Sequence, residues 1–165
     1  VRYDDLAKYE SLEALFADGS KAVVLFYQMH NVNKASAVGH FVVLLDRREF
    51  DSSFTYMDPY GMRPMNDIAK THSDPSLFTQ LVDASPAQLV VDNHQYQQLS
   101  RAVQDCGRWC GVRSFFYKLD NKQFKNLMTK GPLKNDWLVV ALTLLKTPGV
   151  DIYKAIKDTY AHLDL

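Results

Sequence analysis

Three short apolar runs, separated by turn-forming residues, constrain the fold of this 165-residue chain more than any other feature. They cover residues 22–28, 39–46 and 52–57 and are rich in β-branched and aromatic side chains. Such runs predict strands that are buried on both faces. The third run stops at Asp58-Pro59-Tyr60-Gly61, because proline cannot extend a central strand. We therefore expect a small antiparallel or mixed sheet, with Asp58 at the end of one strand.

Helical signals surround these strands. Residues 11–16 predict a short helix capped by Ser11, and Asp74-Pro75-Ser76 begins a helix that runs to about Val82. A fourth strand is expected over residues 87–91, followed by helices over residues 106–117, 121–129, 135–146 and 149–162. The length and a hydrophobic content of 47% suit a single domain, residues 1–165. The sequence thus predicts an α+β fold, with a small central sheet flanked by helices and a helical C-terminal half.

The segment Asp105-Cys106-Gly107-Arg108-Trp109-Cys110 places a cysteine at the start of a predicted helix. The unpaired N–H groups and partial positive charge of a helix N-terminus lower the pKa of a thiol, and the thiolate is the nucleophilic form. The second cysteine, Cys110, lies one turn later among apolar residues, which is typical of core packing. Cys106 is therefore the expected nucleophile.

A cysteine hydrolase also needs a base, a group that orients the base, and donors for the oxyanion. His40 begins the second predicted strand and Asp58 ends the third, and antiparallel neighbours joined by a turn bring these two ends together. We expect His40 to be the base and Asp58 to orient it. Gln98 or Gln97, together with the Cys106 backbone N–H, would form the oxyanion hole.

Several classes of function are disfavoured by the bulk properties. A formal net charge of zero argues against a nucleic-acid binder driven by overall charge, and two cysteines cannot build a disulfide framework. We expect no metal, since His94 is the only histidine near the cysteines, and no cofactor. The apolar runs are too short to cross a bilayer, and the polar opening residues resemble no signal peptide. The sequence therefore predicts a protein of a reducing compartment that is neither secreted nor bound to a membrane.

The motifs Gly39-His40-Phe41, Asp58-Pro59-Tyr60-Gly61 and Cys106-Gly107-Arg108-Trp109, with a glutamine before the cysteine, resemble the adenain-like cysteine proteases. This family includes maturation proteases of adenoviruses, polintons and virophages. The resemblance runs from about residue 3 to residue 117 and is greatest to the virophage type, of the mavirus kind. The family's glutamine usually stands six or seven residues before the cysteine. We therefore favour Gln98, which stands eight residues before Cys106, with Gln97 as the alternative.

The resemblance implies an adenain-like, papain-like fold with His40 as base, Asp58 as orienting acid and Cys106 as nucleophile. It implies an endopeptidase that cleaves capsid or scaffold precursors after small, glycine-containing sequences in the virion and the host cytoplasm. We expect a monomer that is active without DNA. Two alternatives from the same clan remain open, a SUMO-like or ubiquitin-like isopeptidase and an acetyltransferase. An inactive interaction module is a third alternative.

Overall fold

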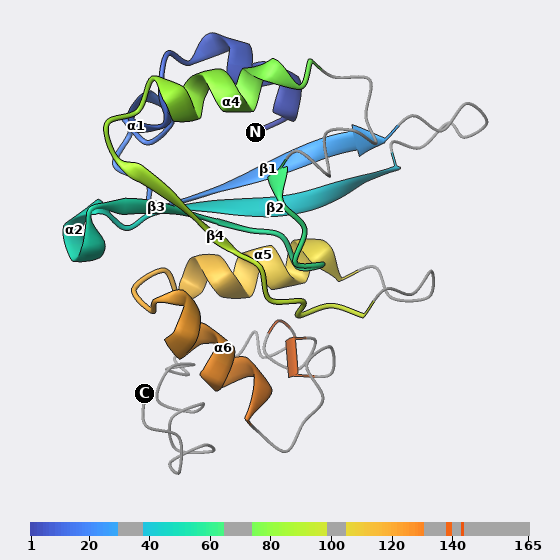
Figure 1. Cartoon of the computed structure of the whole chain (residues 1–165). Coiled ribbons are helices and arrows are strands. Elements are labelled where there is room, and N and C mark those ends of the chain that lie inside the picture. Colours follow the sequence, from blue (N-terminus) through green and yellow to red (C-terminus); the bar gives the residue numbers. More distant parts are fainter. Residues whose placement is uncertain (30–37, 65–73, 99–104, 131–137, 140–142, 144–165) are drawn as a thin grey trace.

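A four-stranded mixed sheet forms the centre of the computed structural model, which describes residues 1–29, 38–64, 74–98, 105–130, 138–139 and 143 (Figure 1). The strands lie side by side in chain order: β1 (Ala22–Met29), β2 (Val38–Asp46), β3 (Ser53–Met57) and β4 (Gln88–Asp92). β2 is antiparallel to both β1 and β3, and β4 is parallel to β3. The expected α+β class with a mixed sheet is confirmed.

Helices cover both faces of the sheet (Figure 1). The 3-10 helix η1 (Tyr3–Lys8), α1 (Leu12–Leu15) and α4 (Ser76–Asp83) lie on one face. The opposite face holds α5 (Cys106–Phe115) and α6 (Asn121–Thr129), and the single turn α2 (Arg48–Asp51) connects β2 to β3. The helix that begins at Cys106 is therefore packed directly against the sheet.

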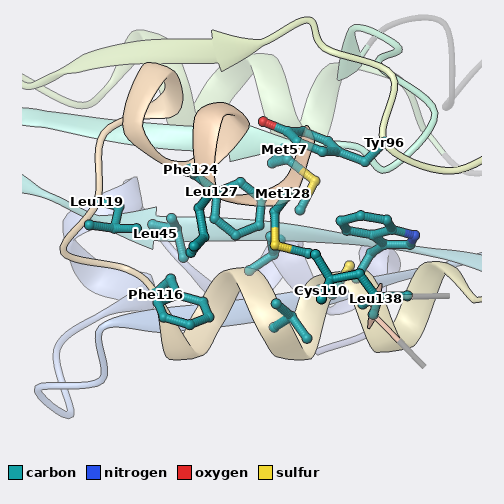
Figure 2. Packing of buried hydrophobic residues seen from close by; sticks show 14 residues of the cluster. Leu45, Met57, Tyr96, Cys110, Phe116, Leu119, Phe124, Leu127, Met128 and Leu138 are labelled. Atoms are coloured by element: carbon teal, nitrogen blue, oxygen red, sulfur yellow. The ribbon is translucent and has the colours of Figure 1, made fainter. Parts of the chain in front are cut away.

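The continuous apolar run in β2 follows from this three-layer arrangement. Successive side chains of a strand point to opposite faces, and in β2 each face meets a different core. Val42 and Leu44 join the cluster beneath η1 and α4, while Val43 and Leu45 join the cluster beneath α5 and α6. Figure 2 shows Leu45 and Met57 packed in that second cluster. The part of β2 from Val42 to Leu45 is buried on both sides, which is why it holds no polar residue.

The elements expected from the sequence agree with those of the structure to within two residues over the described ranges. Ser11 caps α1 as expected, since its Oγ accepts a hydrogen bond from the N–H of Ala14 at 3.3 Å. The helices expected over residues 135–146 and 149–162 lie outside the described residues, apart from Leu138, Val139 and Thr143. Across the described ranges, no helix combines the length and the hydropathy that a bilayer crossing requires.

Gly39 is required where β1 and β2 come close. A Cβ at this position would lie 2.2 Å from Phe26 Cζ and 2.4 Å from the carbonyl oxygen of Tyr27. The Phe26 ring can turn, but the carbonyl belongs to the paired strand, so the two strands would have to separate. We expect Gly39→Ala to lower the free energy of unfolding by about 2 kcal/mol, measured by urea denaturation.

The matched control is Gly111→Ala, in the exposed part of α5. Apart from the backbone of α5 itself, no heavy atom of the described residues lies within 4 Å of the Cβ that this substitution adds. Alanine also favours the helix, so we expect this variant to gain about 0.5–1 kcal/mol. Equal effects of the two substitutions would contradict the close approach at Gly39.

Candidate functional site

The site lies where β2 extends beyond its neighbour β3. The pairing of these strands stops at Val43 and Met57, and β2 continues from there back to Val38. His40 lies on this extension, and Asp58 follows the last residue of β3. The start of α5, which packs against β2, brings Cys106 to the same place. The sequence analysis expected a strand start, a strand end and a helix start to come together. The structure brings His40, Asp58 and Cys106 together in this way.

His40 and Asp58 form a buried pair. His40 Nε2 lies 2.8 Å from Asp58 Oδ1, and the two residues are only 4% and 0% exposed. The same carboxylate oxygen accepts a hydrogen bond from the backbone N–H of Tyr60 at 2.8 Å. A buried carboxylate held from two sides fixes the orientation of the imidazole, and it stabilises the imidazolium form.

The second nitrogen of the His40 ring serves the thiol. Because Nε2 faces Asp58, Nδ1 is the atom left to interact with Cys106. Burial alone would raise the pKa of the Cys106 thiol. The imidazole of His40 and the backbone N–H groups of Phe41 and Gly107 outweigh this effect, so that the thiol pKa lies below its ordinary value.

The imidazole responds in the opposite direction. Burial alone would lower the pKa of His40, but the hydrogen bonds and charges of Asp58 and Cys106 outweigh it and raise the pKa to about 9. The lowered pKa of the thiol and the raised pKa of the imidazole both favour a thiolate–imidazolium pair. The sequence analysis did not identify the backbone N–H of Phe41 as a partner of the Cys106 sulfur. This N–H can reach Cys106 because the pairing of β2 with β3 ends at Val43, which leaves the preceding part of β2 open to α5.

Cys110 has the opposite environment. Its side chain is fully buried in the core cluster, where Figure 2 shows it between α5 and the neighbouring apolar side chains. Burial, followed by the negative charges of Cys106 and Asp58, raises the pKa of the Cys110 thiol well above its ordinary value. Cys110 therefore stays protonated and inaccessible, as expected of a core residue.

The two candidate glutamines differ in position. Gln97 is fully buried, and its Nε2 donates to the hydroxyl of Tyr60 at 3.2 Å. Gln98, favoured from the sequence, has an exposed side chain. The difference arises because the N–H groups of Tyr96 and Gln97 both donate to the carbonyl of Pro59, at 2.9 and 2.8 Å, which ties this segment to the Asp58 turn.

A glycine allows this turn to approach so closely. Gly61 has a φ of +70°, and a Cβ there would lie 2.9 Å from both Asn93 O and Gln95 N. Its N–H closes the turn on the carbonyl of Asp58 at 2.8 Å. The Asp58-Pro59-Tyr60-Gly61 turn thus links the Asp58 carboxylate to the loop after β4 that holds Gln97.

Phe41 and Gly107 lie against each other beside Cys106. Phe41 is 37% exposed, and its Cδ2 lies 3.4 Å from where a Cβ on Gly107 would be. The Phe26 ring packs against the Phe41 ring, with ring centroids 4.8 Å apart. Within the part of the chain that the structure describes, no three His, Cys, Asp or Glu side chains gather in a way that could hold a metal ion.

Fold and site together define an α+β protein with a buried thiol–imidazole–carboxylate arrangement at one end of its sheet. Among known proteins, the chain is similar to an uncharacterized protein, V9, of Sputnik virophage, with 26% identity over 76% of this chain and 71% of that protein. No protein-family model matches the sequence, and no solved structure gives a significant match. The chain therefore resembles a viral protein, as the sequence motifs had suggested.

Proposed function

We propose that this protein is a cysteine endopeptidase of the adenain-like type that cleaves structural precursor proteins during virion maturation. The observation that carries the proposal is the assembly of Cys106, His40 and Asp58 from three separate elements into one buried, hydrogen-bonded site. The similarity to a virophage protein supports a viral role. The expected compartment is the virion and the host cytoplasm, where a free thiol stays reduced.

In this proposal each residue has one chemical task. The Cys106 thiolate attacks the substrate carbonyl, and the Cys106 backbone N–H and the Gln97 amide donate to the developing oxyanion. His40 Nδ1–H then protonates the leaving amine, which leaves an acyl-thioester on Cys106. Water, deprotonated by His40, releases the acyl group and restores the thiolate. We assign the amide to Gln97 rather than Gln98 because Gln97 is the buried residue beside Tyr60.

Substrate preference follows from the residues beside Cys106. We expect a substrate backbone to reach Cys106 past Phe41 and Gly107, where a bulky side chain would meet the Phe41 ring. We therefore expect cleavage after small residues, glycine above all. The protein substrates would be capsid or scaffold precursors, and we expect a monomer that needs no DNA for activity.

Alkylation and cleavage together test the proposal. Purified wild type, Cys106→Ala and Cys110→Ala are treated with iodoacetamide at pH 7, and each is incubated with a peptide library whose products are identified by mass spectrometry. We expect wild type and Cys110→Ala to alkylate rapidly at Cys106 and to cut after glycine, and Cys106→Ala to do neither. Fast alkylation without any peptide cleavage would contradict an endopeptidase. A ubiquitin-like modifier with a Gly-Gly tail and acetyl-CoA would then test the isopeptidase and acetyltransferase alternatives.

A further inference from the structure

Tyr60 contacts His40, Asp58 and Gln97, each through a different group. Its ring stacks on the His40 imidazole, with centroids 4.9 Å apart and planes 24° from parallel. Its backbone N–H donates to Asp58 Oδ1 at 2.8 Å. Its hydroxyl accepts a hydrogen bond from Gln97 Nε2 at 3.2 Å. One residue thus joins the base, the acid and the buried glutamine.

We propose that Tyr60 is a positioning residue that sets both the plane of the His40 imidazole and the orientation of the Gln97 amide. The inference rests on the proposed function and names the group that keeps its oxyanion hole in order. Its two contacts act through different atoms of the same side chain, the ring and the hydroxyl. Substitutions can therefore separate them.

The hydroxyl matters because the amide of a glutamine turns easily. The terminal torsion of glutamine is broad, so the amide alone has no fixed direction. With one N–H of Nε2 held by Tyr60 Oη, the plane of the amide is set, and with it the direction of its second N–H. An oxyanion donor acts only when it is oriented before the charge develops, so a freely turning amide loses much of its effect.

The ring matters for the thiol. Asp58 holds the imidazole at one atom, which fixes a position but leaves rotation about the hydrogen bond. The Tyr60 ring, nearly parallel to the imidazole, restricts that rotation and keeps Nδ1 directed at Cys106. Because the backbone N–H of Tyr60 also holds Asp58 Oδ1, the carboxylate and the stacked ring belong to one short turn.

The test compares Tyr60→Phe, which removes only the hydroxyl, with Tyr60→Leu, which also removes the aromatic ring. For Tyr60→Phe we expect kcat to fall about tenfold with KM unchanged, and the pH profile of Cys106 alkylation to stay as in wild type. For Tyr60→Leu we expect the alkylation profile to move to higher pH as well. The matched control is Tyr96→Phe, a buried tyrosine whose hydroxyl donates instead to Asp92 at 2.8 Å, and it should cleave like wild type.

A double variant decides whether the hydroxyl acts through Gln97. If it does, adding Tyr60→Phe to Gln97→Ala should cause no further loss of kcat, since the amide that it orients is already absent. The role of the hydroxyl would be overturned if the double variant lost kcat by the product of the two single losses. A Tyr60→Phe variant as active as wild type would overturn it as well. An unchanged alkylation profile in Tyr60→Leu would overturn the role of the ring. Alkylation needs no substrate, so this second arm gives a result even where wild type cuts no peptide and the proposed function itself fails.

Discussion

The variant His40→Ala should lose peptide cleavage by about four orders of magnitude and should alkylate slowly at neutral pH. Removing the imidazole leaves Cys106 buried, and burial by itself raises the pKa of the thiol. The N–H groups of Phe41 and Gly107 remain, but the principal partner that favours the thiolate is gone. We therefore expect the inflection of the alkylation rate to move to higher pH, measured with iodoacetamide between pH 5 and pH 10.

The wild-type cleavage profile should be bell-shaped. On the acid side the Cys106 thiolate takes up a proton, and because the thiol pKa is lowered this limb lies below the ordinary range of cysteine. On the alkaline side His40 loses its proton at about pH 9, and with it the acid that protonates the leaving amine. In Asp58→Asn the imidazolium loses its carboxylate, so the alkaline limb should move to lower pH and the bell should narrow.

The matched control is His94→Ala. This half-buried histidine packs edge-on against Tyr96, with ring centroids 4.6 Å apart, and belongs to none of the groups assigned above. It should keep the wild-type rate and both limbs of the profile. If His40→Ala alkylated as fast as wild type at neutral pH, the helix start alone would account for the thiolate, and the role of His40 as base would be lost.

The two central strands of the sheet, β2 and β3, could be predicted from the sequence because most of their residues are buried on both faces. Each of Val42, Val43, Leu44 and Leu45 has 0% exposure, so the apolar run has sharp ends at polar residues. Cys106 and His40 could be picked out for a similar reason. A reactive side chain at the first residue of a helix or near the start of a strand is recognisable from local pattern alone, before any long-range contact is known.

The glutamine of the proposed oxyanion hole could not be identified from the sequence in this way. Neighbouring residues in a loop can point in opposite directions, and only the hydrogen bonds from Tyr96 and Gln97 to Pro59 determine that the side chain of Gln97 is the buried one. Those bonds join segments about forty residues apart, and no local pattern encodes them. The contact of Tyr60 with His40 follows instead from the pairing of β2 with β3, which brings the turn after Met57 to the His40 end of β2.

Arg113 is a second residue that local pattern did not single out, and it should be among the largest contributors to stability. It lies on α5 with 0% exposure, although arginine is rarely buried completely. Its guanidinium donates to the carbonyls of Phe116 at 2.8 Å and Leu119 at 3.0 Å, and it lies over the Phe124 ring at 4.6 Å. Burial lowers the pKa of Arg113 to about 10, so the group remains charged at neutral pH. The buried cation thus holds the turn that joins α5 to α6.

We expect Arg113→Met to lower the free energy of unfolding by about 3 kcal/mol. The aliphatic part of the side chain is preserved, but the carbonyl of Phe116 loses this donor inside the core, and such a loss costs about 1–3 kcal/mol. The carbonyl of Leu119 keeps a hydrogen bond from Arg47 at 2.9 Å, which limits the damage there. Arg113→Lys should recover only part of the loss, because one ammonium group cannot reproduce the planar fork of a guanidinium.

Urea and thermal denaturation of Arg113→Met and of Arg108→Met measure this contribution. Both substitutions remove an arginine from α5, but the Arg108 side chain is 42% exposed, and its ion pair with Asp105, at 3.3 Å, is worth at most about 1 kcal/mol. The melting temperature should fall by about 6–12 °C in Arg113→Met and by no more than about 4 °C in Arg108→Met. If the two variants unfolded alike, the buried guanidinium would contribute no more than an exposed one, and the α5–α6 turn would have to be held by its apolar contacts. If Arg113→Met is the less stable, α5 owes its attachment at the end far from Cys106 to a cation in the core.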